Sequence, residues 1–127
     1  MLTNRQKGNI GEDVACTFLL KRGFKIVERN YLKKCGEIDI IAKKEKSLHF
    51  VEVKSTTKKV IKNSSNSYSP EENVHVLKMK RMRRVIQIYL SERKYSPNVE
   101  FYFHVIVVHM NMDTRRASVS FIENVIL

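Results

Sequence analysis

Two short segments, residues 36–42 and 50–54, constrain the fold most, because each places an acid inside an apolar, β-branched run. The first segment is Gly-Glu-Ile-Asp-Ile-Ile-Ala and the second is Phe-Val-Glu-Val-Lys. Their composition and alternation predict two β-strands. A carboxylate within a buried strand is costly unless it is paired or holds a cation. Asp39 and Glu52 therefore mark either a structural ion pair or a functional site.

The register of these two strands decides whether their charged residues meet. Because side chains alternate along a strand, Glu37 and Asp39 are expected on one face, and Glu52 and Lys54 share a face of the second strand. Ile41 is expected to share the face of Glu37 and Asp39, and the opposite face is expected to carry Ile38, Ile40 and Ala42. A two-residue hairpin loop places Asp39 opposite Glu52 and Glu37 opposite Lys54. A four-residue loop keeps all four on one face, and a three-residue loop separates the two sets.

The length and charge of the chain suggest one basic domain with an anionic partner. Its 127 residues are enough for a single domain, residues 1–127, with its own core. The 24 Lys and Arg residues outnumber the 13 Asp and Glu residues, which gives a formal net charge of +11. Such an excess favours nucleic acid as the partner ahead of a membrane surface. A basic domain without an anionic partner is the alternative.

Several absences in the sequence predict a soluble, cytoplasmic protein. No apolar run approaches the roughly 20 residues that a membrane span needs. The first seven residues do not begin an apolar leader segment. Cys16 and Cys35 stand in unrelated contexts without a metal-binding spacing, so we expect reduced thiols.

The order of predicted elements is α-β-β-β-α-β-β, which indicates an α/β fold. Helices are predicted at residues 4–22 and 72–92, and strands at 24–30, 37–43, 48–54, 99–110 and 117–123. A first helix packed on a mixed sheet, with the second helix as the crossover into a buried strand, satisfies the rules for layered folds.

The first helix carries two interior glycines that need an explanation. The larger apolar residues are expected to form one side of it: Ile10, Val14, Phe18, Leu19 and Leu20. A second stripe consists of small residues with one acid and a leucine: Gly8, Gly11, Glu12, Ala15 and Leu19. Each interior glycine costs about 1 kcal/mol relative to alanine, and close approach of the helix to the sheet would explain that cost. Glu12 would then point at the sheet, although a solvated helix residue is the alternative.

Two basic segments are candidates for contact with phosphates. Residues 55–72 are polar, serine-rich and basic, and they predict a mobile loop after the second acid-bearing strand, with plain disorder as the alternative. The second helix carries a run of cations without an interleaved acid, which favours phosphate contact over a solvated face. The predicted nucleic-acid-binding residues are Lys58, Lys59, Lys78, Lys80, Arg81 and Arg84.

The acids and the lysine of the two strands could form a metal-dependent catalytic site. Asp39 and Glu52 offer the hard oxygen ligands that suit Mg²⁺ or Mn²⁺. Lys54 could stabilise a hydroxide or the charge of a transition state, Glu37 could orient Lys54 or a water, and Glu12 could add a third carboxylate. In the alternative, Lys54 forms a purely structural ion pair with Glu52 or Asp39. Spacing alone leaves both interpretations open.

Four motifs together resemble a known family. They are Gly11-Glu12, Arg29-Asn30-Tyr31, the segment at 36–42 and the segment at 50–54. This combination resembles the YraN-like family of small bacterial proteins. That family is similar to the PD-(D/E)XK, or restriction-endonuclease-like, superfamily and to the Holliday-junction resolvases within it. The resemblance covers nearly the whole chain and implies a restriction-endonuclease-like αβββαβ core with a mixed β-sheet flanked by helices.

The resemblance also implies an activity. It implies a Mg²⁺-dependent endonuclease that acts on DNA rather than RNA, with branched DNA as one candidate substrate. Asp39 and Glu52 would be metal ligands, Lys54 the catalytic lysine and Glu12 the acid that completes the site, while Lys78 matches a basic position that opens the second helix. Related resolvases act as dimers, so a homodimer is compatible with the resemblance. The alternatives are a non-catalytic nucleic-acid-binding protein that keeps the fold, and a structural protein in which Lys54 only neutralises the acids.

Overall fold

The computed structural model describes residues 2–57 and 72–127, with side chains from residue 76 onward in the second part. Most of the segment predicted as a mobile loop, residues 55–72, lies outside the described residues. Lys58 and Lys59, two of the predicted nucleic-acid-binding residues, lie there as well.

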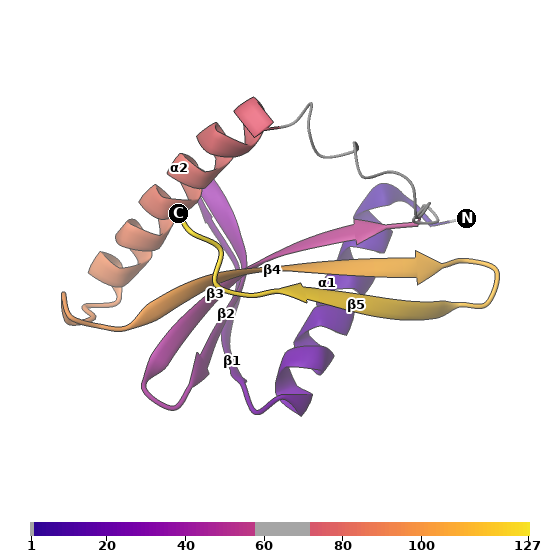
Figure 1. Cartoon of the computed structure of the whole chain (residues 1–127), viewed down its shortest axis with the longest axis horizontal. Coiled ribbons are helices and arrows are strands. Elements are labelled where there is room, and N and C mark those ends of the chain that lie inside the picture. The colour runs from indigo at the N-terminus through magenta and orange to yellow at the C-terminus, as the bar shows by residue number, and fades with distance from the viewer. Residues whose placement is uncertain (1, 58–71) are drawn as a thin grey trace.

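Five strands form one mixed sheet with a helix on each face (Figure 1). The elements in chain order are α1 (Asn4–Lys21), β1 (Lys25–Lys33), β2 (Gly36–Lys44), β3 (Ser47–Thr56), α2 (Glu72–Glu92), β4 (Phe101–Asn111) and β5 (Arg116–Ile122). The strands lie side by side in chain order, antiparallel except for the parallel pair β3–β4. This arrangement confirms the predicted α/β fold and αβββαβ core, with α2 as the crossover between the two parallel strands.

Helix α1 begins and ends as its sequence predicts. The Gln6 amide donates to Thr3 Oγ1 (3.1 Å), and the Thr3 amide donates to Gln6 Oε1 (2.8 Å), which is a complete capping box. After the C-cap residue Arg22, Gly23 adopts a φ of 89°, a left-handed conformation that glycine tolerates without strain.

The buried face of α1 is largely the stripe of small residues predicted to lie close to the sheet, and not the side of larger apolar residues. Its buried residues are mostly small: Gly11, Ala15, Cys16 and Leu19. Leu20 and Ile10, expected on an apolar side, are 56% and 38% exposed. The short side chains of the small-residue stripe let the helix lie close to the sheet, which leaves part of the larger apolar side exposed.

Gly11 marks the closest approach between α1 and β3. A Cβ atom added at Gly11 would overlap the Ser55 hydroxyl and lie 3.1 Å from Ser55 Cβ. Close approach to the sheet therefore explains this glycine, as predicted. It does not explain Gly8, where an added Cβ would meet no atom within 4 Å.

Helix α2 packs on the opposite face with the apolar side that its periodicity predicts. Its buried residues recur at helical spacing: Met79, Met82, Val85, Ile86 and Tyr89. They form one core cluster with sheet residues that include Phe50 and Ile41, whereas α1 covers a separate cluster that contains Ile40 and Val51. Because neighbouring strand residues supply opposite clusters, both faces of β2 and β3 are covered, and this explains their continuous apolar sequences.

The β2–β3 hairpin has the two-residue loop, one of the three registers considered. Lys44 pairs with Ser47, and the pairing continues to Ile40 opposite Val51. Beyond this pair, the Val53 amide donates instead to the Asp39 side chain (Oδ2, 2.8 Å). A carboxylate thus replaces a main-chain carbonyl as the acceptor, and the two strands separate where the predicted site begins.

The alternation of β2 changes at the same point, which corrects the expected grouping of its apolar residues. Ile40 packs in the α1-side cluster, but Ile38 packs in the α2-side cluster. The neighbouring strand is irregular here, because Asn30 of β1 has a φ of 54°, in the left-handed region. Strict alternation holds for a regular pleat, and the pleat is interrupted where β2 leaves β3.

Candidate active site

Four acids from three elements surround the point where β2 and β3 separate. Glu12 comes from α1, Glu37 and Asp39 from β2, and Glu52 from β3; we call these four residues the acid cluster. The Asn30 amide, oriented toward its acceptors, donates to Glu12 Oε1 (3.0 Å) and Glu37 Oε1 (3.1 Å). Residues far apart in sequence thus meet at one place, as predicted for Glu12.

Burial and like charges raise the pKa of Asp39. Desolvation is the main cause that raises its pKa from 3.8 to about 6, and the charges of Glu12, Glu37 and Glu52 raise it further. The hydrogen bond from the Val53 amide opposes this shift. Because an ionised Asp39 is disfavoured by its surroundings, a bound cation would relieve an existing electrostatic cost.

This raised pKa predicts how Asp39→Asn changes stability with pH. The pKa of Asp39 is about 6 in the folded protein and 3.8 without the influence of the fold, so the folded protein binds the proton more tightly than the unfolded chain does. Wild type therefore loses stability as the pH rises between these two values. The asparagine side chain cannot ionise, so the variant escapes this loss. Above about pH 6 the variant should be more stable by roughly 1–2 kcal/mol, allowing for partial solvent screening.

Urea denaturation of both proteins across this pH range measures the difference. The stabilisation should disappear as the pH falls below 3.8, where Asp39 becomes protonated in both folded and unfolded wild type. An equal difference at both ends of the range would contradict the assignment of the raised pKa to Asp39. Asp113→Asn, at an exposed position in the β4–β5 turn, is the matched control and should show no such pH dependence.

The cation paired with Glu52 comes from α2 and not from the motif lysine. The Glu52 side chain is 12% exposed, and its Oε1 lies 2.7 Å from Lys78 Nζ. Lys54 is exposed, and within residues 2–57 and 76–127 no ion pair joins it to Asp39 or Glu52. The structural ion pair considered for Lys54 is therefore not formed, and Lys78 takes that place at Glu52.

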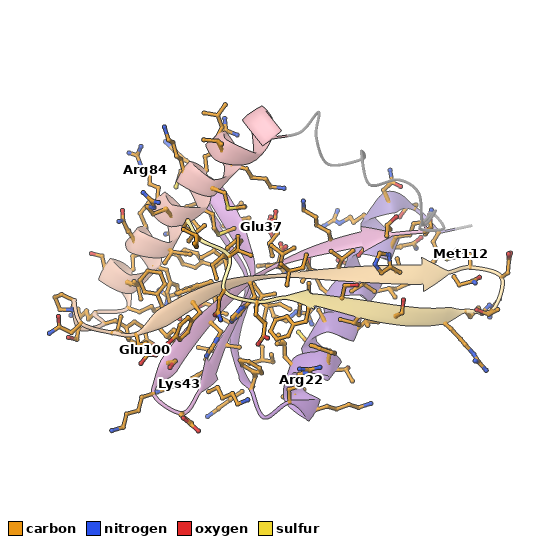
Figure 2. The ribbon with its side chains drawn as sticks, in the orientation of Figure 1. Arg22, Glu37, Lys43, Arg84, Glu100 and Met112 are labelled. Atoms are coloured by element: carbon orange, nitrogen blue, oxygen red, sulfur yellow. The ribbon has the colours of Figure 1, made fainter. Side chains whose placement is uncertain are left out.

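A basic groove adjoins the acid cluster. This pocket of about 760 Å³ includes Glu37 and Glu52 in its walls, so it shares two residues with the cluster. Its cations come from the end of β1, from the β1–β2 turn and from α2: Lys33, Lys34, Lys78, Lys80, Arg81 and Arg84. All four predicted nucleic-acid-binding residues that the structure describes line this groove, and Arg84 projects outward from α2 (Figure 2).

Comparison with known proteins places the chain in a family. Residues 11–108, which contain the acid cluster, Lys54 and Lys78, match the uncharacterised protein family UPF0102. The chain belongs to this family. The match confirms the YraN-like family predicted from the four motifs.

Relatives in the UPF0102 family align over most of the chain. A UPF0102 protein of Caldicellulosiruptor saccharolyticus is 35% identical over 123 residues, which cover 97% of this chain and 98% of the relative. One of Helicobacter pylori is 40% identical over 105 residues, 83% of this chain and 82% of the relative. One of Campylobacter jejuni is 45% identical over 82 residues, 65% and 66% of the two chains.

Three residues that the structure places at the candidate site were not predicted from the sequence as site residues. Asn30 is part of one of the four motifs, but it was not predicted to contact the acids. Asparagine tolerates a left-handed φ better than most residues do, so an asparagine within a predicted strand is a signal of an irregularity in that strand. Lys33 ends β1 and Lys34 begins the β1–β2 turn, and this adjacent pair of cations is a sequence signal for a wall of the groove.

Two further expectations concern the cysteines and the membrane. Cys16 and Cys35 are both free thiols, in agreement with their unrelated sequence contexts. Among the helices of the described UPF0102 chain, none is long and apolar enough to cross a membrane.

Proposed function

We propose that this UPF0102 chain is a metal-dependent endonuclease of the PD-(D/E)XK type that hydrolyses phosphodiester bonds in DNA, with branched DNA as a candidate substrate. The observation that carries the proposal is the acid cluster, with its raised Asp39 pKa, next to a groove lined by six cations. Acids attract a divalent cation, and cations attract the phosphates of the substrate. Neighbouring sites of both kinds are what phosphodiester hydrolysis requires.

Asp39 and Glu52 are the proposed ligands of Mg²⁺ or Mn²⁺. Their oxygens suit a hard cation, although the described residues contain no group of three His, Cys, Asp or Glu side chains already arranged to hold a metal. Mg²⁺ commonly uses one or two carboxylates and completes its shell with waters and substrate phosphates, so two ligands fit this ion. When bound, the ion would polarise a phosphoryl oxygen and acidify a bound water.

The chain's own residues would position the reactants. The Val53 amide holds one oxygen of Asp39 and thereby fixes the carboxylate at the separation of the strands. Lys54 follows Glu52 by two residues on β3, and its exposed ammonium would stabilise negative charge on the phosphate. Glu12 and Glu37, tied together through Asn30, would accept hydrogen bonds from the attacking water.

A non-catalytic nucleic-acid-binding protein is the second candidate. It is favoured by the Glu52–Lys78 ion pair, which already neutralises one proposed ligand without a metal. This candidate predicts DNA binding that depends on salt and is indifferent to chelation of the metal.

Cleavage assays with plasmid and branched DNA separate the two candidates. The endonuclease should cut in Mg²⁺ or Mn²⁺ and stop when a chelator is added. Binding without cleavage in either metal would reject the catalytic proposal in favour of the second candidate.

DNA binding itself should depend on the groove cations under either candidate. Lys80→Ala or Arg84→Ala should weaken binding similarly for unrelated sequences and reduce the salt slope by about 1, because each removes one phosphate contact. Fluorescence anisotropy with labelled DNA over a salt series measures both quantities. Lys43→Ala is the control, since this exposed lysine lies at the hairpin end of β2, away from Arg84 (Figure 2). Equal effects of all three variants would argue against the groove as the binding surface.

A further inference from the structure

Lys78 lines the basic groove and also contacts the acid cluster, through Glu52. Its ammonium lies 2.7 Å from Glu52 Oε1, and both residues line the groove. The Lys78 side chain is 49% exposed, whereas Glu52 is only 12% exposed. Glu52 is thus largely enclosed by the protein, while Lys78 is partly exposed to solvent.

The position of Lys78 makes the ion pair exchangeable. A lysine carries its point charge on a flexible four-carbon stem, so it can change partner without movement of the helix. Lys80, Arg81 and Arg84 line the same groove from the same helix, so a phosphate attracted by them would come near Lys78 as well. The phosphate would compete with Glu52 for the ammonium.

We propose that Lys78 couples the basic groove to the metal site: a DNA phosphate in the groove draws Lys78 away from Glu52, and Glu52 then becomes available to a divalent cation. Without DNA, Lys78 occupies the carboxylate and weakens metal binding. This inference rests on the proposed function, since it uses Glu52 as a metal ligand and DNA as the occupant of the groove. The inference adds that the metal and the DNA bind cooperatively.

Thermodynamic linkage turns the coupling into a measurable quantity. If DNA strengthens metal binding by removing Lys78 from Glu52, metal must strengthen DNA binding by the same factor. Coupling between two sites typically amounts to roughly 5–150-fold in affinity. We expect an effect in this range for wild type and a much smaller effect once Lys78 is removed.

Isothermal titration of Mn²⁺ into the protein, with and without a short, cleavage-resistant DNA duplex, tests this coupling. In wild type the duplex should tighten Mn²⁺ binding at least about 5-fold. Lys78→Ala should tighten Mn²⁺ binding already without DNA, and the duplex should add little. Glu52→Ala and a titration of the duplex alone identify the heat that comes from Mn²⁺ bound elsewhere.

Lys80→Ala is the matched control for the loss of one positive charge. Lys80 lines the same groove on the same helix, but the described structure pairs Glu52 with Lys78. Lys80→Ala should weaken DNA binding and leave the coupling in place. Lys78→Arg, which retains the charge, should preserve the coupling, and circular dichroism verifies that each variant is folded.

The outcomes distinguish this inference from the proposed function. Equal Mn²⁺ affinity with and without duplex, or equal behaviour of Lys78→Ala and Lys80→Ala, would overturn the role of Lys78 even if DNA is cleaved. Coupling that requires Lys78 in a protein that never cuts DNA would support the inference and reject the endonuclease. If Glu52→Ala binds Mn²⁺ as wild type does, both the role of Lys78 and the proposed metal site are overturned.

Discussion

Replacing Asp39 with asparagine is expected to lower metal-dependent DNA cleavage by about 10²–10³-fold, the size of effect seen when one electrostatic group of a catalytic site is removed. Asparagine retains an oxygen that can accept the hydrogen bond from the Val53 amide, so the strands should separate as in wild type. What it loses is the negative charge that would hold the metal. DNA affinity measured without a divalent cation should remain close to wild type, because the phosphate contacts come from the groove cations.

Initial cleavage rates at saturating Mg²⁺ measure the loss of activity, and fluorescence anisotropy in the presence of a chelator measures DNA affinity without metal. Asp113→Asn is the matched control, since it makes the same chemical change at an exposed turn and should cleave at the wild-type rate. Cleavage that survives Asp39→Asn at full rate would place the activity elsewhere in the protein or in a contaminant. A loss of DNA binding in the absence of metal would indicate a folding defect instead.

Gly11→Ala and Gly8→Ala are expected to change stability in opposite directions, although both place the same methyl group in helix α1. At Gly11 the new Cβ would overlap the Ser55 hydroxyl and lie 3.1 Å from Ser55 Cβ. Such overpacking costs roughly 1–3 kcal/mol, more than the helix gains from alanine. At Gly8 the methyl group meets no atom within 4 Å, so the gain of up to about 1 kcal/mol remains.

Chemical denaturation of the two variants and wild type measures both changes. A second substitution, Ser55→Gly, should restore much of the stability lost in Gly11→Ala, because it removes both clashing atoms. It should not change the effect of Gly8→Ala. Equal stabilisation by alanine at both positions would show that α1 can move away from β3 at no cost.

The elements and their order could be predicted from sequence because each carries its own local signal. The capping box at Thr3, the periodicity of α2 and the alternating strand segments depend on neighbours in the chain. The β2–β3 register could be reduced to three alternatives, since loop length determines which residues face each other. Local information was therefore enough for the fold class and for the place of the acids.

The detailed arrangement of the site could not be predicted from sequence, because it depends on contacts between segments that are distant in the chain. Lys54 was the obvious partner for Glu52 by proximity in sequence, yet Lys78 of α2 holds that acid. The position of Lys78 depends on how α2 packs across the sheet, which no local pattern encodes. In the same way, Ile38 changes face because β2 leaves β3, and Asn30 joins Glu12 to Glu37 because three elements meet there.

The order of strands in the sheet has a consequence for how the site is assembled during folding. Strands β1, β2 and β3 pair through two successive hairpins, whereas the β3–β4 pair must enclose the whole of α2. Local pairings incur little loop-closure entropy, so the hairpins can form before the parallel pair. Asp39 and Glu52 both lie within this early unit, and the groove is completed only when α2 docks. The proposed metal ligands would therefore come together first, and the cation that pairs with Glu52 would arrive with the last large step of folding.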